Sequence, residues 1–383
     1  MEKLTSQELK SLITSVFTPG PSDKNLAILV DVPDTPEEDD DKWLERRAIA
    51  YSWAEEFQTV AADLNLDSVN LILYPNVHNN NADLPEYAYT FSGDISHLTT
   101  GTLRAKGEKI AFAHVLGNNQ IFMALTEYSA TAPLKLQAAK YGFRAATMPG
   151  FSSEMIPALR LDYEEINRRV LAIKEILDEA TGVEIEFTTD DDHQYHIHFD
   201  LRFRKGHASG GRFPEKGSAG NLPSGESYIV PYEGEKEEIS LSEGTLPVQF
   251  DDEIVLYRID KNTAVEILSK GRYSDIEAQK IKNEPAYANI SEIGFGVLSD
   301  FGISPIGEIL LDEKLGLHIA FGRSDHFGGA IGIKDFTSPE NVIHIDRIYI
   351  PETQSRITAR YVKIINQNSG DFQLMENGRY TIF

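Results

Sequence analysis

The chain of 383 residues contains no cysteine. This absence excludes a disulfide framework, a thiolate nucleophile, an iron–sulfur cluster and a cysteine-ligated zinc site. Any metal ion must therefore be bound by histidine, aspartate, glutamate or tyrosine side chains.

Basic residues are also scarce, with 36 Lys and Arg against 60 Asp and Glu, which gives a net charge of −24. Nucleic-acid binding depends mainly on Lys and Arg neutralising phosphates, so this balance argues against a nucleic-acid partner. An excess of acid usually serves solubility alone, although it would also suit a cationic or amine-bearing small substrate.

Long apolar runs are missing as well. No stretch approaches the roughly 20 residues that span a bilayer. The first eight residues, MEKLTSQE, are polar and mixed in charge, unlike a signal peptide. We therefore expect a cytoplasmic protein with no membrane partner.

The length suggests two domains. In the first half, short apolar runs alternate with helical patterns, which is typical of βα units around a largely parallel sheet. The expected strands are residues 26–30, 71–74, 121–125 and 145–149, and the expected helix is 43–64. The acidic stretch 34–41 is expected to be a solvated loop rather than a metal site.

Residues 163–180 carry apolar side chains at three- and four-residue intervals, which predicts a helix with one buried face: Ile166, Val170, Ile173 and Leu177. Beyond Gly182 the pattern changes to short alternating strands, and Asn377-Gly378 predicts a type I′ hairpin. We predict α/β plus α+β architecture, with an N-terminal α/β domain with a largely parallel sheet at 1–182 and a β-rich, metal-binding catalytic domain at 183–383. The glycine-dense stretch 205–225 matches no phosphate-binding motif and predicts a mobile surface loop near an active site.

Four segments of the second half alternate an ionisable residue with large aliphatic residues. Because alternate residues of a strand share a face, His344 and Asp346 point the same way, and His318, Glu292 and Glu226 likewise oppose apolar neighbours. An isolated buried carboxylate is costly, so each must be paired, protonated or bound to a metal. Imidazole nitrogen with carboxylate oxygen suits Zn²⁺, Mn²⁺, Co²⁺ or Fe²⁺.

A second histidine cluster competes for a metal. His196, His198 and Asp200 share a strand face, with His193 just before them. A His-x-His pair on a strand can bind zinc, but this polar face is more simply explained as a solvated one.

The four segments occur in an order that resembles the thermophilic-type metallo-aminopeptidases, the aminopeptidase T family. They are Gly220–Glu226, Ser291–Gly294, Asp312–Gly322 and His344–Asp346. The resemblance is clearest from about residue 220 to about residue 350, and a weaker one covers 144–201.

This resemblance implies a two-domain, homodimeric hydrolase, a metalloprotease with two divalent ions, Zn, Co or Mn. The implied ligands are Glu226, Glu292, His318, His344 and Asp346, and the position of the family's tyrosine ligand is taken by Asp325, so that Asp325 or its neighbour His326 would replace it. Glu292, Asp312 and Glu313 would be the catalytic residues. Two ions would polarise a peptide carbonyl and activate water, and a peptide or small amine-bearing substrate would bind by its free amino group.

The same residues permit other interpretations. His318, His344 and Asp346 form the two-histidine, one-carboxylate set of mononuclear non-haem Fe(II) oxygenases. A distant branch, which resembles 2,5-dihydroxypyridine dioxygenase, carries such a single Fe(II). A third possibility is a non-catalytic descendant that binds a peptide-like ligand. The presence of both Glu226 and Glu292 favours the aminopeptidase interpretation.

Overall fold

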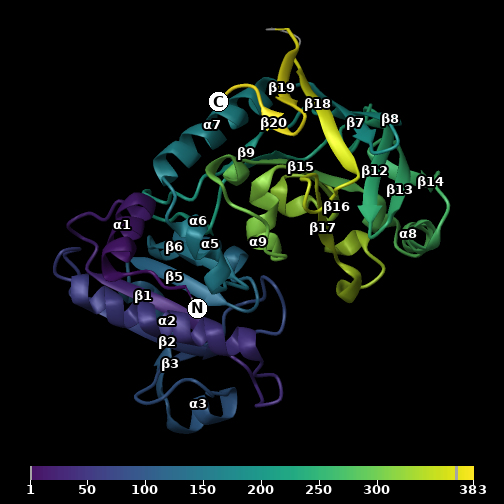
Figure 1. Cartoon of the computed structure of the whole chain (residues 1–383). Helices are drawn as coiled ribbons and strands as arrows, with labels where there is room; N and C mark the ends of the chain where they lie inside the picture. The colour runs from purple at the N-terminus through teal and green to yellow at the C-terminus, as the bar shows by residue number, and fades with distance from the viewer. Residues whose placement is uncertain (1, 367–369) are drawn as a thin grey trace. The chain divides into compact units, whose positions relative to one another are not determined.

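A computed structural model describes residues 2–366 and 370–383 (Figure 1). The chain divides into two compact units. The first comprises residues up to 167, with 209–224 and 306–311, and the second comprises 168–208, 225–305 and 312–383. Along the chain the first crossing between them falls within helix α7 (Tyr163–Glu179).

The first unit contains alternating helices and strands. They are α1 (Ser6–Phe17), β1 (Asn25–Val32), α2 (Asp41–Val60), β2 (Ser68–Pro75), β3 (Tyr87–Thr90), α3 (Thr100–Lys106), β4 (Glu108–Ala111), α4 (Phe112–Asn118), β5 (Ile121–Thr126), α5 (Thr131–Tyr141), β6 (Arg144–Pro149), α6 (Ile156–Leu159) and β10 (Ala219–Asn221). The four predicted strands are confirmed, and the predicted helix 43–64 corresponds to α2.

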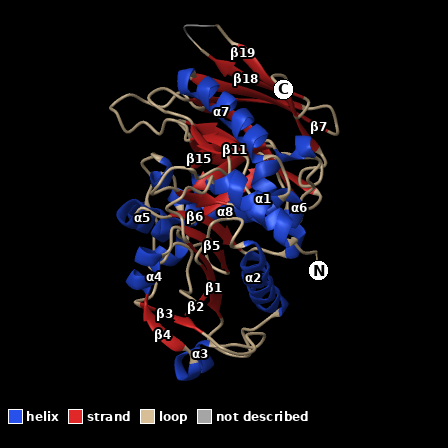
Figure 2. Cartoon of the chain, turned by 90° about the vertical axis from the view of Figure 1, so that its left-hand side faces the viewer, coloured by secondary structure: helices blue, strands red, loops and turns tan. Residues whose placement is uncertain are grey.

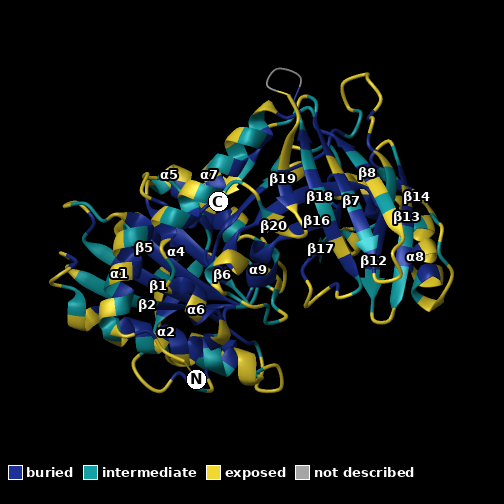
Figure 3. Ribbon diagram, turned by 45° about the horizontal axis from the view of Figure 1, so that its top comes forward, coloured by how far each residue is buried: buried dark blue, intermediate teal, exposed yellow. Residues whose placement is uncertain are grey.

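These strands form a seven-stranded sheet in the order β10-β6-β5-β1-β2-β3-β4. The first five strands are parallel, and β3 and β4 add an antiparallel edge, so the sheet is only partly parallel. Figure 2 shows α2 on one side of the sheet and α4 and α5 on the other. Coverage of both faces explains why the central strands are mostly apolar and almost entirely buried (Figure 3).

The acidic stretch 34–41 has a structural role at the start of α2. The Asp40 side chain accepts hydrogen bonds from the backbone N–H groups of Lys42 and Trp43 and so caps the helix. Asp39 forms an ion pair with the buried Arg47, 2.6 Å from its Nη2. Both acids therefore stabilise this unit.

One buried carboxylate near the end of β1 makes the stability of this unit depend on pH. Asp31 is fully buried and accepts the backbone N–H of Glu127 with both oxygens. Burial raises the pKa of Asp31 to about 7, although the Arg46 charge opposes the shift. The folded state therefore holds the Asp31 proton more tightly than the unfolded state does. The stabilisation that results is fully present below pH 4 and is lost as the pH rises to about 7.

We expect Asp31→Asn to remove this pH dependence, which amounts to at most roughly 4 kcal/mol between pH 4 and pH 7. Urea unfolding followed by tryptophan fluorescence will measure it, because both tryptophans, Trp43 and Trp53, lie in α2 of the same unit. Asp63→Asn, at an exposed ion pair with Lys10, is the control and should keep the wild-type slope. Equal pH slopes in wild type and Asp31→Asn would contradict the assignment.

The second unit is rich in strands. Besides most of α7, it contains β7 (Gly182–Thr189), β8 (Gln194–Asp200), β9 (His207–Ser209), β11 (Glu226–Ile229), β12 (Glu243–Phe250), β13 (Glu253–Asp260), β14 (Thr263–Ile267), α8 (Arg272–Asn283), β15 (Ile290–Gly296), the end of α9 (Ile309–Asp312), β16 (Leu317–Gly322), β17 (His344–Ile348), β18 (Ile357–Ile365), β19 (Phe372–Glu376) and β20 (Arg379–Tyr380).

Two sheets organise this unit. An eight-stranded sheet runs β14-β13-β12-β8-β7-β18-β19-β20, and a five-stranded sheet runs β17-β16-β15-β11-β9, with β17 at its edge. The Asn377-Gly378 hairpin is confirmed between β19 and β20, with φ of 48° and 74° at the two turn residues. The predicted buried face of α7 is also confirmed, because its four apolar residues are fully buried.

The glycine-dense stretch 205–225 differs from the expected mobile surface loop. It contributes β9 to the five-stranded sheet and β10 to the seven-stranded sheet. A Cβ at Gly220 would lie 2.7 Å from the Phe213 ring, so this glycine permits close packing rather than motion. Within the described ranges, no helix is long and apolar enough to cross a membrane.

Candidate metal centre

The five-stranded sheet brings the ionisable segments onto one face. Its antiparallel register places Gly294 opposite both Tyr228 and His318, and places Ala320 opposite both Glu292 and Asp346. His344, the first residue of β17, pairs with Gly322, and Glu226, the first residue of β11, pairs with Gly296. Because paired residues of neighbouring strands share a face, the five predicted ligands converge.

Small residues between the ligands create the space that the side chains occupy. A Cβ at Gly294 would lie 1.8 Å from Nε2 of His318, so the imidazole lies directly over this glycine. A Cβ at Gly296 would lie 2.1 Å from the carbonyl carbon of Lys314, so the chain before β16 also passes over a glycine. Any larger residue at either position would displace the site.

Both imidazoles are held by their Nδ1 atoms. Nδ1 of His344 lies 2.9 Å from the Arg323 carbonyl oxygen, and Nδ1 of His318 lies 3.2 Å from the Gly316 carbonyl oxygen. Both Nε2 atoms point at Glu292, at 3.3 Å for His344 and 3.4 Å for His318. An imidazole anchored in this way presents Nε2 as a metal ligand in a fixed orientation.

Two sets of three residues have ligand atoms that all lie within 4.8 Å of one another in the described part of the chain. The first is Glu226, Glu292 and His318, and the second is Glu292, His344 and Asp346. Oε2 of Glu226 and Oδ1 of Asp346 are buried without a hydrogen-bond partner. Because buried polar atoms are almost always satisfied, these oxygens and their neighbours fit a bound divalent ion.

The protonation of the site supports this fit. Burial opposes ionisation of Glu292, but hydrogen bonds from His318 and His344 hold its pKa below the ordinary value. Burial likewise opposes the charging of His318, yet Glu292, Glu226 and Asp346 raise its pKa to about 9. Asp346 and Glu292 raise the pKa of His344 in the same way. The metal-free site therefore holds protons on both imidazoles, which a divalent ion would replace.

A buried lysine occupies one half of the site. The Lys314 side chain is 1% exposed, and its Nζ lies 2.5 Å from Oε1 of Glu226 and also contacts Glu313. These two carboxylates outweigh burial and keep the pKa of Lys314 above its ordinary value. The first set of three residues thus already has the positive charge of Lys314 against its Glu226, whereas neither carboxylate of the second set pairs with this lysine.

Aromatic rings pack beside His344. Phe327 packs edge-on against His344 with ring centroids 5.6 Å apart, and His326 does so at 5.5 Å. Tyr228 stacks on His207 at 5.0 Å and meets Phe327 edge-on at 4.8 Å. We call His207, Tyr228, His326 and Phe327 the aromatic row.

The other predicted site residues lie around this centre. Asp325 belongs to neither set of three and pairs with Arg323 at 2.6 Å, and His326 approaches His344 through its ring. Glu313 contacts Lys314, and Asp312 is buried just before it.

The competing histidine cluster also belongs to neither set of three. It lies on β8, where His196 is 67% exposed and 3.8 Å from Glu186. His196 and His198 line an open cavity of about 1050 Å³ on the eight-stranded sheet.

Sequence reasoning named only His326 of the aromatic row, as a possible ligand, and missed the other three members and the role of Lys314. Tyr228 was detectable, because it lies two residues after Glu226 on the same strand and therefore shares its face. His207 and Phe327 lie far from the ligands in sequence, and no local pattern marks them. Lys314 stands directly after Glu313, but only the fold over Gly296 shows that its ammonium reaches Glu226.

Comparison with known proteins gives a likeness in fold. No family model matches the chain, and no curated protein matches it either. Among solved structures, the chain resembles 2,5-dihydroxypyridine dioxygenase from Pseudomonas putida KT2440, with a TM-score of 0.60 and 17% sequence identity. The match covers 99% of this chain and 97% of the dioxygenase chain.

This result corrects the interpretation as a member of the aminopeptidase T family. The expected hydrolase, aminopeptidase and metalloprotease activity is wrong, since the whole-chain likeness is to a dioxygenase and no aminopeptidase family matches. The site offers a physical reason. A two-ion peptidase needs Glu226 as a ligand, but here that carboxylate binds the Lys314 ammonium. The short ligand motifs occur in the order that suggested an aminopeptidase, but this order does not distinguish peptide hydrolysis from dioxygenase chemistry.

Proposed function

We propose that this protein is a mononuclear non-haem Fe(II) dioxygenase that opens a hydroxylated aromatic ring. Glu292, His344 and Asp346 would hold the ion, and His318 would support them through the other oxygen of Glu292. With His318 included, the site also contains the two histidines and one carboxylate, His318, His344 and Asp346, that are typical of mononuclear non-haem Fe(II) oxygenases. When bound, the iron supplies the activation of O₂, and both oxygen atoms enter the product as one ring bond breaks.

Lys314 supports a single ion. Its ammonium pairs with Glu226 and contacts Glu313, and without it both groups would be buried near Glu292 with no positive partner. A second divalent ion in the first set of three residues would have to lie against this fixed positive charge.

The observation that carries the proposal is the aromatic row. Phe327 and His326 pack against His344, one of the proposed ligands, and Tyr228 extends the row to His207. Aromatic rings bind flat aromatic molecules by stacked and edge-on contacts. A planar substrate fits this surface better than an extended peptide, whose backbone needs hydrogen-bonding partners.

Glu313 is suited to accept the proton of a substrate hydroxyl. Burial raises its pKa to about 8, against the opposing charge of Lys314. A carboxyl group with a pKa near the working pH can accept and release a proton. Lys314 would stay charged and favour the anionic form of the hydroxyl group.

The test is oxygen uptake by protein reconstituted anaerobically with Fe(II). We expect about one iron per chain. With hydroxylated pyridines and benzenes, including 2,5-dihydroxypyridine, we expect one O₂ consumed for each ring opened, and ¹⁸O₂ should label the product with both atoms. The control is the Zn²⁺-loaded protein, which should bind metal at the same residues but give no turnover because zinc has no redox chemistry.

Iron-loaded protein that consumes no O₂ across this panel would contradict the proposal. Flat rings that bind without being opened would leave only a binding role.

A further inference from the structure

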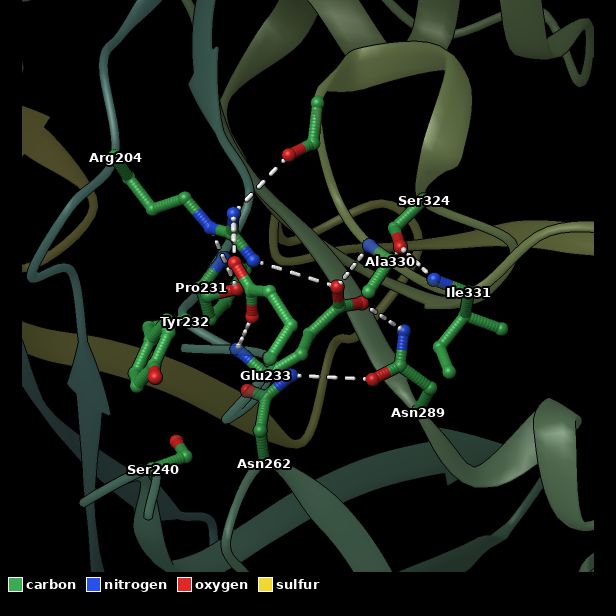
Figure 4. Close-up of polar contacts among 12 residues, drawn as sticks. Arg204, Pro231, Tyr232, Glu233, Ser240, Asn262, Asn289, Ser324, Ala330 and Ile331 are labelled. Carbon is green, nitrogen blue, oxygen red and sulfur yellow. Dashed lines mark hydrogen bonds and ion pairs between the residues drawn. The ribbon is translucent and has the colours of Figure 1, made fainter. Parts of the chain in front are cut away.

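The buried carboxylate of Glu233 lies outside the metal centre and accepts hydrogen bonds from four donors. Its side chain is 4% exposed. Oε1 accepts from Asn289 Nδ2 at 2.7 Å and from Ser324 Oγ at 2.6 Å. Oε2 accepts from the backbone N–H of Ala330 and from Arg204 Nη2 at 3.4 Å (Figure 4). Glu233 is therefore saturated by neutral and charged donors, and not by a metal ion.

The donors come from three segments that each carry part of the candidate site. Arg204 precedes His207 by three residues, Asn289 precedes Glu292 by three residues, and Ser324 and Ala330 bracket His326 and Phe327. Glu233 itself follows Tyr228 on one segment. One carboxylate thus links every strand or loop that supplies the aromatic row.

The loop from residue 323 to residue 332 depends most on this link. It folds back on itself, with the backbone N–H groups of Ser324 and Asp325 donating to the Ile331 carbonyl oxygen. A Cβ at Gly329 would lie 2.2 Å from Ser324 Oγ and 2.9 Å from Glu233 Oε2, so the loop packs directly on the carboxylate. The Arg204 guanidinium also donates to the Gly328 carbonyl oxygen at 3.1 Å.

We propose that Glu233 is a positioning residue for substrate: it fixes the 323–332 loop so that His326 and Phe327 meet a flat hydroxylated ring beside His344. This inference rests on the proposed function for the nature of the ring. It assigns Glu233 no contact with substrate or metal. Glu233 affects substrate binding only by holding His326 and Phe327 of the aromatic row in place.

The test compares Glu233→Gln with wild type in three measurements. Glutamine replaces one acceptor oxygen of the carboxylate by an NH₂ group, which cannot accept hydrogen bonds from the donors around it. The 323–332 loop should therefore loosen. Hydrogen exchange over residues 323–332 should become roughly tenfold faster, and the Kd for 2,5-dihydroxypyridine under anaerobic conditions should rise roughly tenfold, as expected for lost hydrogen bonds to a charged group. Iron content should stay unchanged, and kcat should change far less than KM.

Glu235→Gln is the matched control. Glu235 pairs with the same Arg204, at 2.6 Å, and accepts the Glu233 backbone N–H at 3.3 Å. It is 27% exposed, however, and among the described residues it has no hydrogen bond to the loop. This variant should keep the wild-type exchange rate and Kd. If Glu233→Gln does not fold, Ser324→Ala is the second variant. It removes one donor to Glu233 and the acceptor of the Ile331 backbone N–H, and it should show the same changes at a smaller size.

The outcomes separate the two proposals. Unchanged loop exchange and Kd in the variant that folds would overturn the positioning role, and so would a loss of iron together with equal losses in kcat and kcat/KM. Ring binding by wild type without ring opening would overturn the dioxygenase but leave positioning supported by the Kd shift. Failure of wild type to bind any flat ring would overturn both.

Discussion

His344→Ala should abolish stoichiometric iron binding and ring opening. The substitution removes the imidazole whose Nε2 lies 3.3 Å from Glu292 and 3.6 Å from Asp346, so the second set of three residues keeps only carboxylates. Loss of a residue that only hydrogen-bonds to a metal ligand lowers metal affinity or activity roughly 10- to 100-fold, so loss of the ligand itself should lower them further. Metal analysis after anaerobic Fe(II) loading and gel filtration, with the oxygen-uptake assay, measures both effects.

The matched control for this prediction is His196→Ala. His196 also lies on a strand beside a carboxylate, but it is exposed and outside both sets of three. It should retain wild-type iron content and turnover. A His344→Ala protein that still carries a full equivalent of iron would show that the metal binds elsewhere.

Lys314→Met should destabilise the metal-free protein and change the number of ions bound. Removing the ammonium leaves Glu226 and Glu313 buried without their positive partner, and breaking a buried ion pair in this way costs about 3–5 kcal/mol. The first set of three residues then becomes free to bind a cation. In Zn²⁺ or Mn²⁺ the variant should therefore bind about two ions per chain instead of about one, and recover stability as it does so.

Lys280→Met provides the comparison for Lys314. Lys280 also pairs with a buried glutamate, Glu277, at 2.6 Å, but its own side chain is 51% exposed. Its loss should cost less than about 1 kcal/mol, because the exposed ammonium adds little and Glu277 keeps the hydrogen bonds from the Tyr257 and Tyr287 hydroxyls. The metal stoichiometry should be unchanged. Metal titration gives the number of ions bound per chain, and urea unfolding with and without metal gives the free energy of unfolding. A Lys314→Met protein with wild-type stability and one ion would refute the role given to the lysine.

The period of two along each strand was enough to predict which side chains share a face. It placed His344 with Asp346 and gave the apolar opposite face of His318 and Glu292 correctly. It could not give the register between strands, which depends on hydrogen bonds between distant segments. The division of the five residues into two sets around Glu292 therefore needed the structure.

The functional prediction failed for a related reason. The ligand motifs occupy short strands whose geometry is shared by different chemistries, so they predict a metal site but not its reaction. The features that favour an aromatic substrate and one ion lie elsewhere: Tyr228 on a neighbouring strand, Phe327 in a loop, and a lysine folded over Gly296. Their proximity results from tertiary packing, which no local sequence pattern contains.

The location of β17 at the edge of its sheet links metal affinity to local unfolding. This strand supplies His344 and Asp346, yet only β16 holds it through backbone hydrogen bonds in the described sheet. Edge strands open more easily than central ones, and an ion that binds two side chains of such a strand closes it against fraying. An ion bound as proposed would thus also reduce how often this strand detaches, and would hold the last strand of the sheet in place.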